Sequence, residues 1–365
     1  MLRLIRPSIA DIIPYNAKTI PCRVKLDIME GPYDLPQGIK SKIQDVVERI
    51  HFNRYPDPEA TALKRSLADY TGVPLEMIYV GNGSDELILS LLLAFGGEGR
   101  KAIFPEPSFP IYSLLAKITS TEPCPIPLAE GFELNDSKII DAAKEKPSII
   151  FIAYPNNPTG NCFQKESLLR IIRETEALVV IDEAYYEFSK ESLVNALSLY
   201  KNLVILRTFS KAFGLAAIRC GYLLANLEVI TQINKVKPPY NLNSLSQEIA
   251  VILLSEREWT KKVLDELISQ RDWLYNELLK IKAIKLYPSK TNFIYFETEN
   301  PGRVYSKLLA DGILIKQVAG GLRVTIGKPE ENQAFLDNLT FISSTLDTKS
   351  VNRINLDTKP KSYKL

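Results

Sequence analysis

Short apolar runs alternate with helical patterns through the middle of the chain. The apolar runs, rich in β-branched residues, are Met77–Val80, Lys101–Phe104, Ser148–Ala153, Leu178–Ile181 and Leu203–Arg207. Between them, apolar residues recur at helical spacing in Asp85–Phe95, Lys165–Thr175 and Glu191–Tyr200. Because alternating strands and helices build a parallel sheet that is covered on both faces, the pattern predicts an α/β fold with a mainly parallel sheet.

One further apolar run, Cys220–Ala225, follows closely after Leu203–Arg207. Only 12 residues separate the two runs. A crossover helix between parallel strands needs about a dozen residues or more, so this spacing is tight. We therefore expect Cys220–Ala225 to run antiparallel to its neighbour.

The pattern changes after about residue 240. A long stretch rich in Glu, Lys, Arg and Leu, from about 244 to 281, predicts one long helix. It is followed by apolar runs at Thr291–Glu297 and Leu322–Ile326, with a helical pattern at Pro301–Asp311 between them. These elements predict a smaller α+β domain after the large one.

These changes divide the chain into four parts. We expect an N-terminal arm over residues 1–30, which packs on the small domain or on a partner subunit, and a large domain over 31–240. The small domain is expected over 241–345. Residues 346–365 are polar and lack periodicity, so we expect them to form a mobile tail.

Composition narrows the class of protein. Of the 365 residues, 45% are hydrophobic and 24% are charged, as in ordinary globular proteins. The formal net charge of +2 gives no bias toward nucleic acid or an acidic membrane surface. The longest apolar run, about Leu87–Phe95, is too short to span a bilayer, and the N-terminal residues lack the pattern of a signal peptide.

The cysteines and the histidine narrow the class of protein further. The four cysteines are scattered and none forms a C-x-x-C pair, so we expect reduced thiols and a cytoplasmic protein, although the sequence leaves disulfide pairing open. The only histidine is His51, which excludes a His-rich zinc site. We therefore expect no metal.

Polar residues follow four of the predicted strands where each strand ends. The segments are Gly81–Glu86, Tyr154–Gly160, Asp182–Tyr185 and Thr208–Lys211. Taken singly, each is also typical of a turn, a helix cap or a solvated lysine. In parallel sheets, however, ligands bind outside the carboxyl ends of the strands. We therefore expect an amide, a carboxylate, an amine and a glycine-rich turn to share one rim.

This combination matches the needs of pyridoxal 5'-phosphate (PLP). Its aldehyde forms a Schiff base with a lysine amine, here Lys211, and its ring nitrogen pairs with a carboxylate, here Asp182. Asn157 and Tyr185 are placed to donate hydrogen bonds to the ring oxygen. Once a substrate amine displaces Lys211, the freed amine can move a proton at the substrate Cα. We therefore predict an amino-group-transferring enzyme with Lys211, Asp182 and Tyr185 as its catalytic residues.

The cofactor phosphate requires N–H groups at a helix N-terminus, hydroxyls and a cation. We expect these from Gly83, Ser84, Asp85, Thr208, Ser210 and Arg219. Phe109 could stack on the ring of the cofactor, and core packing explains that residue equally well.

These segments resemble those of the fold-type I aminotransferases of the aspartate aminotransferase superfamily. The resemblance lies in Asn157–Gly160, Asp182–Tyr185 and Ser210-Lys211 with Arg219. A closer resemblance, to the histidinol-phosphate aminotransferase family, comes from Asn53–Asp57, Gly81–Glu86, Arg207–Ala212 and Leu322–Gly327. It extends over about residues 12–340. It implies a large domain with a mainly parallel seven-stranded sheet, a smaller α+β domain, and a homodimer with active sites at the subunit interface.

The resemblance also implies substrate contacts. Tyr55 would reach the cofactor phosphate of the partner subunit, Arg323 would bind the acidic end of the amino donor or acceptor, and Tyr15 would lie near the substrate phosphate. Asn157 and Tyr55 would also contact the substrate. The implied reaction interconverts L-histidinol phosphate with 2-oxoglutarate and imidazole-acetol phosphate with L-glutamate, in L-histidine biosynthesis.

The chain departs from this family at two places. Met29-Glu30-Gly31-Pro32-Tyr33 stands where the family usually has Asn-Glu-Asn-Pro-Tyr, and Ala334 stands where some members have a second arginine. An aromatic amino-acid aminotransferase and a threonine-phosphate decarboxylase therefore remain open alternatives. A PLP-binding regulatory module without turnover is a third, which the absence of a basic patch or DNA-binding segment disfavours.

Overall fold

Seven strands form the central sheet of the computed structural model, which describes residues 4–10, 12–14 and 20–354, with backbone only for 345–354. The strand order is β2-β8-β7-β6-β5-β3-β4. The strands are β2 (Ile78–Gly81), β3 (Lys101–Glu106), β4 (Glu122–Pro127), β5 (Ser148–Ala153), β6 (Leu178–Asp182), β7 (Leu203–Thr208) and β8 (Gly221–Ala225). Strand β8 is antiparallel to both β7 and β2, and the other pairs are parallel. The predictions of a seven-stranded, mainly parallel sheet and of an antiparallel Cys220–Ala225 are confirmed.

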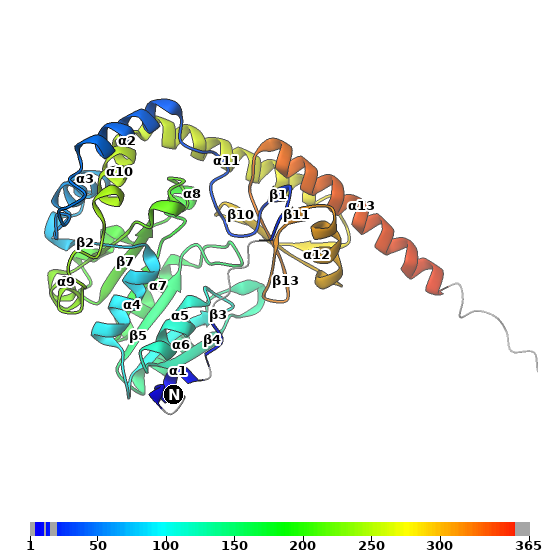
Figure 1. Ribbon diagram of the computed structural model, residues 1–365. Helices are drawn as coiled ribbons and strands as arrows, with labels where there is room; N and C mark the ends of the chain where they lie inside the picture. Colours follow the sequence, from blue (N-terminus) through cyan, green and yellow to red (C-terminus); the bar gives the residue numbers. More distant parts are fainter. Residues whose placement is uncertain (1–3, 11, 15–19, 355–365) are drawn as a thin grey trace, which may run out of the picture.

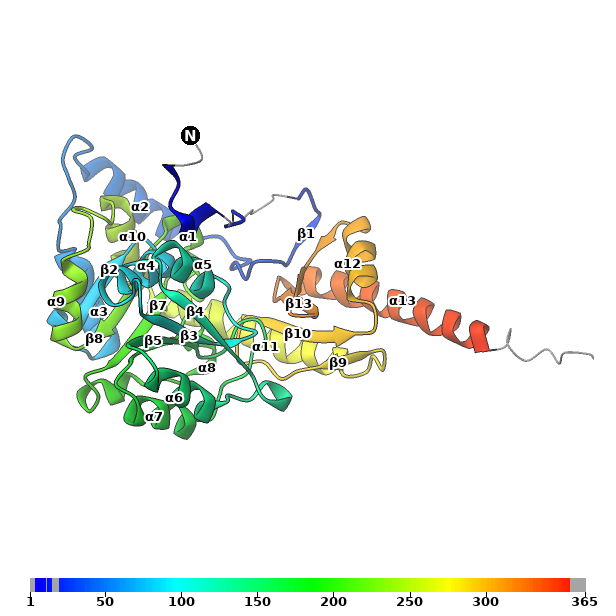
Figure 2. The same ribbon diagram turned by 90° about the horizontal axis from the view of Figure 1, so that it is seen from below.

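Helices cover both faces of this sheet, as Figures 1 and 2 show. One face packs on α4 (Ser84–Phe95), α5 (Ile111–Ile118) and α9 (Leu227–Asn234). The other packs on α3 (Thr61–Thr71), α6 (Asp136–Lys144), α7 (Lys165–Glu174) and α10 (Ser244–Ser255). Successive strand residues point to opposite faces. In β5, accordingly, Ile149 and Phe151 belong to the first core cluster and Ile150 and Ile152 to the second.

The helix predicted over Glu191–Tyr200 is largely wrong. The structure has a short helix α8 (Tyr186–Ser189) and then a 3₁₀ helix over Val194–Ser198. The cause is a side chain from another part of the chain: the carboxylate of Glu183 accepts hydrogen bonds from Ser192 Oγ at 2.9 Å and from the Leu193 N–H at 2.8 Å. These bonds hold the segment against the sheet in a non-helical path.

The single helix predicted over about 244–281 is two helices, α10 and α11 (Arg257–Leu278). They are separated at Glu256, whose ψ of 48° is not helical. The reason is a change of packing partner, because α10 packs on α2 (Gln37–Arg49) and α3, whereas α11 packs on α13 and β10. Helix α11 therefore connects the two halves of the molecule, as Figure 1 shows.

A second, smaller sheet forms the core of the other half. Its order is β12-β13-β10-β9, with antiparallel neighbours. The strands are β9 (Ile284–Leu286), β10 (Phe293–Thr298), β12 (Lys316–Val318) and β13 (Gly321–Thr325), and the helices packed with them are α11, α12 (Pro301–Ala310) and α13 (Pro329–Ile354). Buried Phe293, Phe296 and Phe335 lie in this core. The predicted α+β unit is confirmed.

The N-terminal residues contact both halves. Strand β1 (Val24–Lys25) pairs with β11 (Ile313–Leu314) of the small unit, whereas α1 (Pro7–Ala10) lies against α5 of the large unit. Helix α13 continues to Ile354, beyond the point where we expected a tail without regular structure, because no Gly or Pro follows Pro329 within it. The other residues of the expected tail, 355–365, lie outside the described residues.

All four cysteines lie within the described residues and are free thiols. Among the helices of the described residues, none combines the length and the apolar character that crossing a membrane requires. The expected four-part division of the chain stays a prediction.

Candidate active site

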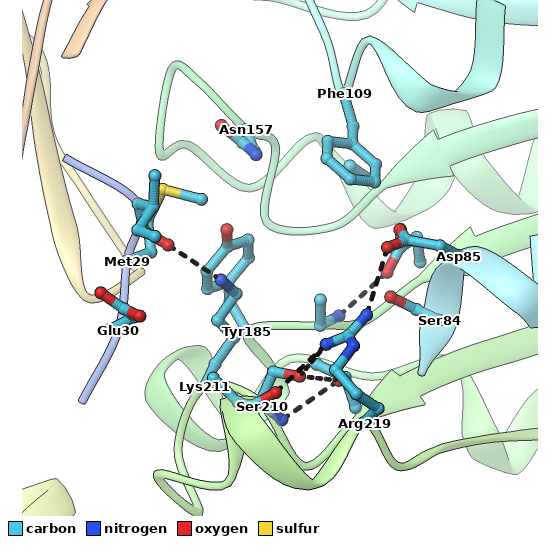
Figure 3. A pocket seen from close by; sticks show the side chains of 16 residues that line it. Met29, Glu30, Ser84, Asp85, Phe109, Asn157, Tyr185, Ser210, Lys211 and Arg219 are labelled. Atoms are coloured by element: carbon cyan, nitrogen blue, oxygen red, sulfur yellow. Dashed lines mark hydrogen bonds and ion pairs between the residues drawn. The ribbon is translucent and has the colours of Figure 1, made fainter. Parts of the chain in front are cut away.

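A cavity of about 220 Å³ lies at the carboxyl ends of the parallel strands. Figure 3 shows Phe109 and Asn157 on one side of it and Lys211, Ser210 and Arg219 on the other. The predicted site residues that line it are Ser84, Asp85, Phe109, Asn157, Asp182, Tyr185, Thr208, Ser210, Lys211 and Arg219. The lining residues that sequence reasoning missed are Ile28, Met29, Glu30, Ala153, Ala184 and Ala216. Segments far apart in the chain therefore meet here as parallel-sheet geometry requires.

Lys211 follows β7 by a few residues and points into the cavity. Its Nζ donates a hydrogen bond to the Ile28 carbonyl oxygen at 3.2 Å. Burial and, to a lesser extent, the positive charge of Arg323 lower the pKa of Lys211 to about 8, while Glu30 and Asp85 act in the opposite direction. A lowered pKa leaves more of the amine neutral near neutral pH, which is the nucleophilic form.

Asp182 ends β6 and is buried. Its Oδ2 accepts a hydrogen bond from the Tyr112 hydroxyl at 2.7 Å, and its Oδ1 accepts one from the Ala184 N–H at 3.2 Å. Burial raises the pKa of Asp182 to about 6, although both hydrogen bonds favour the ionised form. The carboxylate is thus oriented into the cavity, where a protonated ring nitrogen would be a suitable partner.

Tyr112 is a site residue that sequence reasoning missed. It is fully buried on α5, and its ring stacks on Phe151 of β5 with centroids 5.1 Å apart. The ring of Phe109 meets it edge-on at 5.6 Å. The helical pattern around Tyr112 indicated only a buried face, so no sequence signal assigned its hydroxyl to Asp182.

The start of α4 and the turn around Arg219 form a compact cradle. Helix α4 begins after Gly83, which has no side chain to cap the first N–H groups. A Cβ on Gly83 would lie 2.7 Å from Arg219 Nη2, and one on Gly221 would lie 2.9 Å from the Ser84 nitrogen. Gly221 is therefore required for β8 to approach the backbone at the helix N-terminus so closely, and Gly83, at φ 86°, leaves room for the Arg219 guanidinium.

Hydroxyls complete this cradle. Ser210 Oγ accepts a hydrogen bond from Arg219 Nη1 at 3.4 Å, and Thr208 Oγ1 lies 3.1 Å from Ser210 Oγ. Arg219 Nη2 also pairs with Asp85 Oδ2 at 3.3 Å. Uncapped N–H groups, two hydroxyls and a guanidinium are the donors that a phosphate group requires.

Arg323 reaches the site from the small unit. It lies on β13, is buried, and donates a hydrogen bond to Asn157 Oδ1 and another to the Asp27 carbonyl oxygen at 2.9 Å. Arg323 does not itself line the cavity but lies directly behind Asn157. Nearby, Tyr185 packs edge-on against Phe293 with ring centroids 5.3 Å apart, and burial raises the pKa of its hydroxyl.

Tyr55 is a predicted site residue that lies outside the lining of the cavity. Tyr55 is 79% exposed, and its ring stacks on Tyr240 at a centroid distance of 4.4 Å. Its loop is held by Lys237 Nζ, which donates to the Pro58 carbonyl oxygen at 2.9 Å. Tyr15 lies outside the described residues.

The two places where the sequence departs from the family that it resembles lie in different parts of the structure. Met29 and Glu30 line the cavity beside Lys211. Met29 adopts a left-handed conformation (φ 57°), held by hydrogen bonds of its N–H to Thr325 Oγ1 at 3.0 Å and of its carbonyl oxygen to Asn292 at 3.2 Å. Ala334 instead lies on α13, partly buried against the small-unit core. Only the first departure therefore touches the cavity.

Residues 23–339 match the family model of class I and II aminotransferases. This chain belongs to that family. The aminotransferase is 39% identical over 348 residues to the histidinol-phosphate aminotransferase of Caldanaerobacter subterraneus subsp. tengcongensis, covering 93% of this chain and 99% of the relative. It is also 39% identical over 345 residues to the enzyme of that name from Aquifex aeolicus, covering 92% and 97%. The predicted resemblance is thereby confirmed.

Solved structures share the fold of this aminotransferase. The histidinol-phosphate aminotransferase of Sinorhizobium meliloti, solved in complex with pyridoxal-5'-phosphate, superposes with a TM-score of 0.85 at 20% identity, covering 94% of this chain and 98% of that one. The L-threonine-O-3-phosphate decarboxylase of Porphyromonas gingivalis has a TM-score of 0.75 at 23% identity, covering 87% and 99%. At these identities the superpositions show the fold alone.

Proposed function

We propose that this aminotransferase moves an amino group from L-histidinol phosphate to 2-oxoglutarate, forming imidazole-acetol phosphate and L-glutamate, as a step of L-histidine biosynthesis. The observation that carries the amino-transfer chemistry is the meeting of Lys211, Asp182 and the Arg219 cradle in one cavity. The choice of substrate is supported by the relatives, which carry the histidinol-phosphate aminotransferase name at 39% identity over nearly their whole length. A cytoplasmic location is proposed with it.

PLP is the proposed cofactor, and when bound it would supply an electron-accepting ring to the reaction. The residues present fit its groups. Lys211 would hold the aldehyde carbon, Asp182 the ring nitrogen, and Asn157 and Tyr185 the ring oxygen. The phosphate would be held by the backbone N–H groups of Ser84 and Asp85, the hydroxyls of Thr208 and Ser210, and the guanidinium of Arg219.

Lys211 is also the proposed acid and base. Its lowered pKa of about 8 leaves part of the amine neutral near physiological pH, so it can take up a proton at the substrate Cα and return it. The hydrogen bond to the Ile28 carbonyl oxygen orients the amine toward the N-terminal segment that lines the cavity. Tyr112 keeps the Asp182 carboxylate in a fixed orientation and has no direct contact with the cavity.

Arg323 and Asn157 are proposed to bind the acidic end of the amino donor or acceptor. The two side chains are already in contact, so a carboxylate arriving at Asn157 would meet a fixed guanidinium. Tyr15 is proposed to lie near the substrate phosphate.

A homodimer is part of the proposal. The exposed Tyr55 ring, which stacks on Tyr240 and does not line its own cavity, is available to a second copy of the chain. Tyr55 would then reach the cofactor phosphate and the substrate in the partner subunit.

The test begins with the purified protein and PLP. Bound cofactor should give a visible absorbance, and borohydride should fix its mass onto the peptide that contains Lys211. Histidinol phosphate should then remove this absorbance in the unreduced protein, and 2-oxoglutarate should restore it with formation of glutamate. A faster change with phenylalanine, tyrosine or threonine phosphate than with histidinol phosphate would overturn the proposed substrate and leave the cofactor proposal standing.

A further inference from the structure

An acidic side chain lies where an anion is expected to bind. Asp85 lines the cavity at the first turn of α4, and its Oδ2 is 3.3 Å from Arg219 Nη2. The other terminal nitrogen of Arg219 donates to Ser210 Oγ. The carboxylate therefore holds the guanidinium at the mouth of the cradle, as the labelled side chains in Figure 3 show.

The charge of Asp85 has two opposite effects. In the protein without cofactor, it balances a partly exposed guanidinium and the positive end of the α4 dipole. When a phosphate arrives, two anionic groups compete for the same guanidinium, and the carboxylate and phosphate repel each other. Tight phosphate binding alone does not require an acid at this position.

The backbone around Arg219 explains the need for a stabilising partner. Arg219 adopts a left-handed conformation (φ 52°), which is unfavourable for a residue with a side chain. Its guanidinium also approaches Gly83 so closely that a Cβ there would lie 2.7 Å away. An anionic partner keeps this crowded arrangement in place, whether the partner is the phosphate or a carboxylate.

We propose that the Asp85 carboxylate is an internal stand-in for the cofactor phosphate: it keeps the Arg219 cradle formed in the cofactor-free protein and is displaced from Arg219 when the phosphate binds. This inference rests on PLP as the cofactor. Its consequence is that Asp85 stabilises the cofactor-free protein and weakens the binding of phosphate-bearing ligands.

The chain offers a matched control in the next residue of the same helical turn. Glu86 carries the same charge at the same helix end, but its Oε1 accepts a hydrogen bond from Asn241 Nδ2 at 2.6 Å. Replacing Glu86 by Gln therefore removes a nearby charge without removing the Arg219 partner. Asp85→Asn and Glu86→Gln are to be compared as full-length proteins stripped of cofactor and titrated with PLP, with pyridoxal, which lacks the phosphate, and with inorganic phosphate.

Asp85→Asn should bind PLP about three- to tenfold more tightly at low ionic strength, and the gain should shrink as salt is added. Affinity for inorganic phosphate should also rise, whereas affinity for pyridoxal should change by less than the affinity for PLP does, because pyridoxal is affected only through Lys211. The melting temperature of the cofactor-free Asp85→Asn protein should fall by about 1–3 °C. Glu86→Gln should leave the PLP affinity within about twofold of the parent protein.

Three results would overturn the proposal. Weaker or unchanged PLP binding by Asp85→Asn would mean that the carboxylate positions Arg219 for the phosphate. An equal gain in PLP affinity with Glu86→Gln would mean that the effect comes only from the net charge near the site. An equal gain in pyridoxal affinity with Asp85→Asn would mean that the effect does not depend on the phosphate. Failure of the proposed function is distinguishable, because it would appear as absent PLP binding or absent histidinol phosphate turnover in the parent protein.

Discussion

The hydroxyl of Tyr112 donates a hydrogen bond of 2.7 Å to the carboxylate of Asp182, and both residues are buried. This contact joins a helix on one face of the sheet to the end of a central strand. It orients the carboxylate without occupying the cavity, since Tyr112 is not among the lining residues.

Removing this hydrogen bond should lower the affinity of the site for PLP. Tyr112→Phe keeps the ring stacked on Phe151 but removes the hydroxyl that favours the ionised carboxylate, so the pKa of Asp182 should rise above its value of about 6. A hydrogen bond to a charged group contributes about 1.5–3 kcal/mol, so kcat and PLP affinity should fall by about tenfold or more.

Steady-state kinetics and titration of the cofactor-free protein measure both quantities. Tyr79→Phe is the control, because Tyr79 is another fully buried tyrosine but lies on β2 and does not line the cavity. Equal losses in the two variants would mean that Tyr112 acts only through the stability of the core.

The attachment of PLP should depend on pH through Lys211. Because the neutral amine is the reactive form, the rate of attachment to the cofactor-free protein should rise with pH and level off above a midpoint near the pKa of about 8. The charge of Arg323 contributes to lowering this pKa. Arg323→Gln should therefore move the midpoint to higher pH, whereas Arg323→Lys, which keeps the charge, should move it less.

Stopped-flow absorbance over a pH series measures this midpoint. A midpoint near the ordinary lysine value in the parent protein would contradict the role of burial. An identical midpoint in both Arg323 variants would contradict the electrostatic role of Arg323.

Breaking the buried ion pair between Arg207 and Glu183 should lower the stability of the fold strongly. Arg207 Nη2 lies 2.8 Å from Glu183 Oε2, and the two side chains are 3% and 0% exposed. Removing Glu183 deprives the buried Arg207 guanidinium of its hydrogen-bonded carboxylate, with the charge of Glu187 remaining nearby, so Glu183→Ala should lower the free energy of unfolding by about 3–5 kcal/mol. Loss of the hydrogen bonds to Ser192 and Leu193 adds to the effect.

Urea unfolding monitored by circular dichroism measures the change. Glu166→Ala is the control, because Glu166 pairs with Arg173 at 2.6 Å in an exposed pair and should cost about 0–1 kcal/mol. Similar losses in the two variants would show that burial does not determine the strength of the Arg207–Glu183 pair.

Complementation between subunits should reveal whether Tyr55 acts across a dimer. Tyr55→Ala and Lys211→Ala should each be nearly inactive alone. In a mixed dimer, one site would combine an intact Lys211 with an intact Tyr55 from the other subunit. Random mixing should then restore about one quarter of the parent activity, because half of the dimers are mixed and each has one complete site.

Co-refolding of the two variants, with size measured by light scattering, tests this directly. No recovery of activity in a mixture that is shown to contain mixed dimers would mean that Tyr55 acts within its own subunit or not at all.

The sequence by itself determined six of the seven strands of the sheet and the position of the predicted rim. Strand β4 was not predicted, because its sequence (EPCPIP) has no apolar run. Asn157, Asp182 and Lys211, which follow three of the predicted apolar runs, could be assigned to one rim because the carboxyl ends of parallel strands meet at one edge. The antiparallel direction of the last strand also followed from the short connection before it. Both deductions depend on local patterns and chain length, which are fully contained in the sequence.

Only the tertiary structure decided which residues from other parts of the chain contact the predicted site residues. Arg323 contacts Asn157 across 166 positions, Tyr112 contacts Asp182 from a helix, and Ile28 accepts a hydrogen bond from Lys211. Helical periodicity identifies a buried face but not the atoms that the face touches, because those depend on the packing of the whole core. For the same physical reason, Glu183 bound the segment at Ser192 and prevented the helix that local spacing favoured.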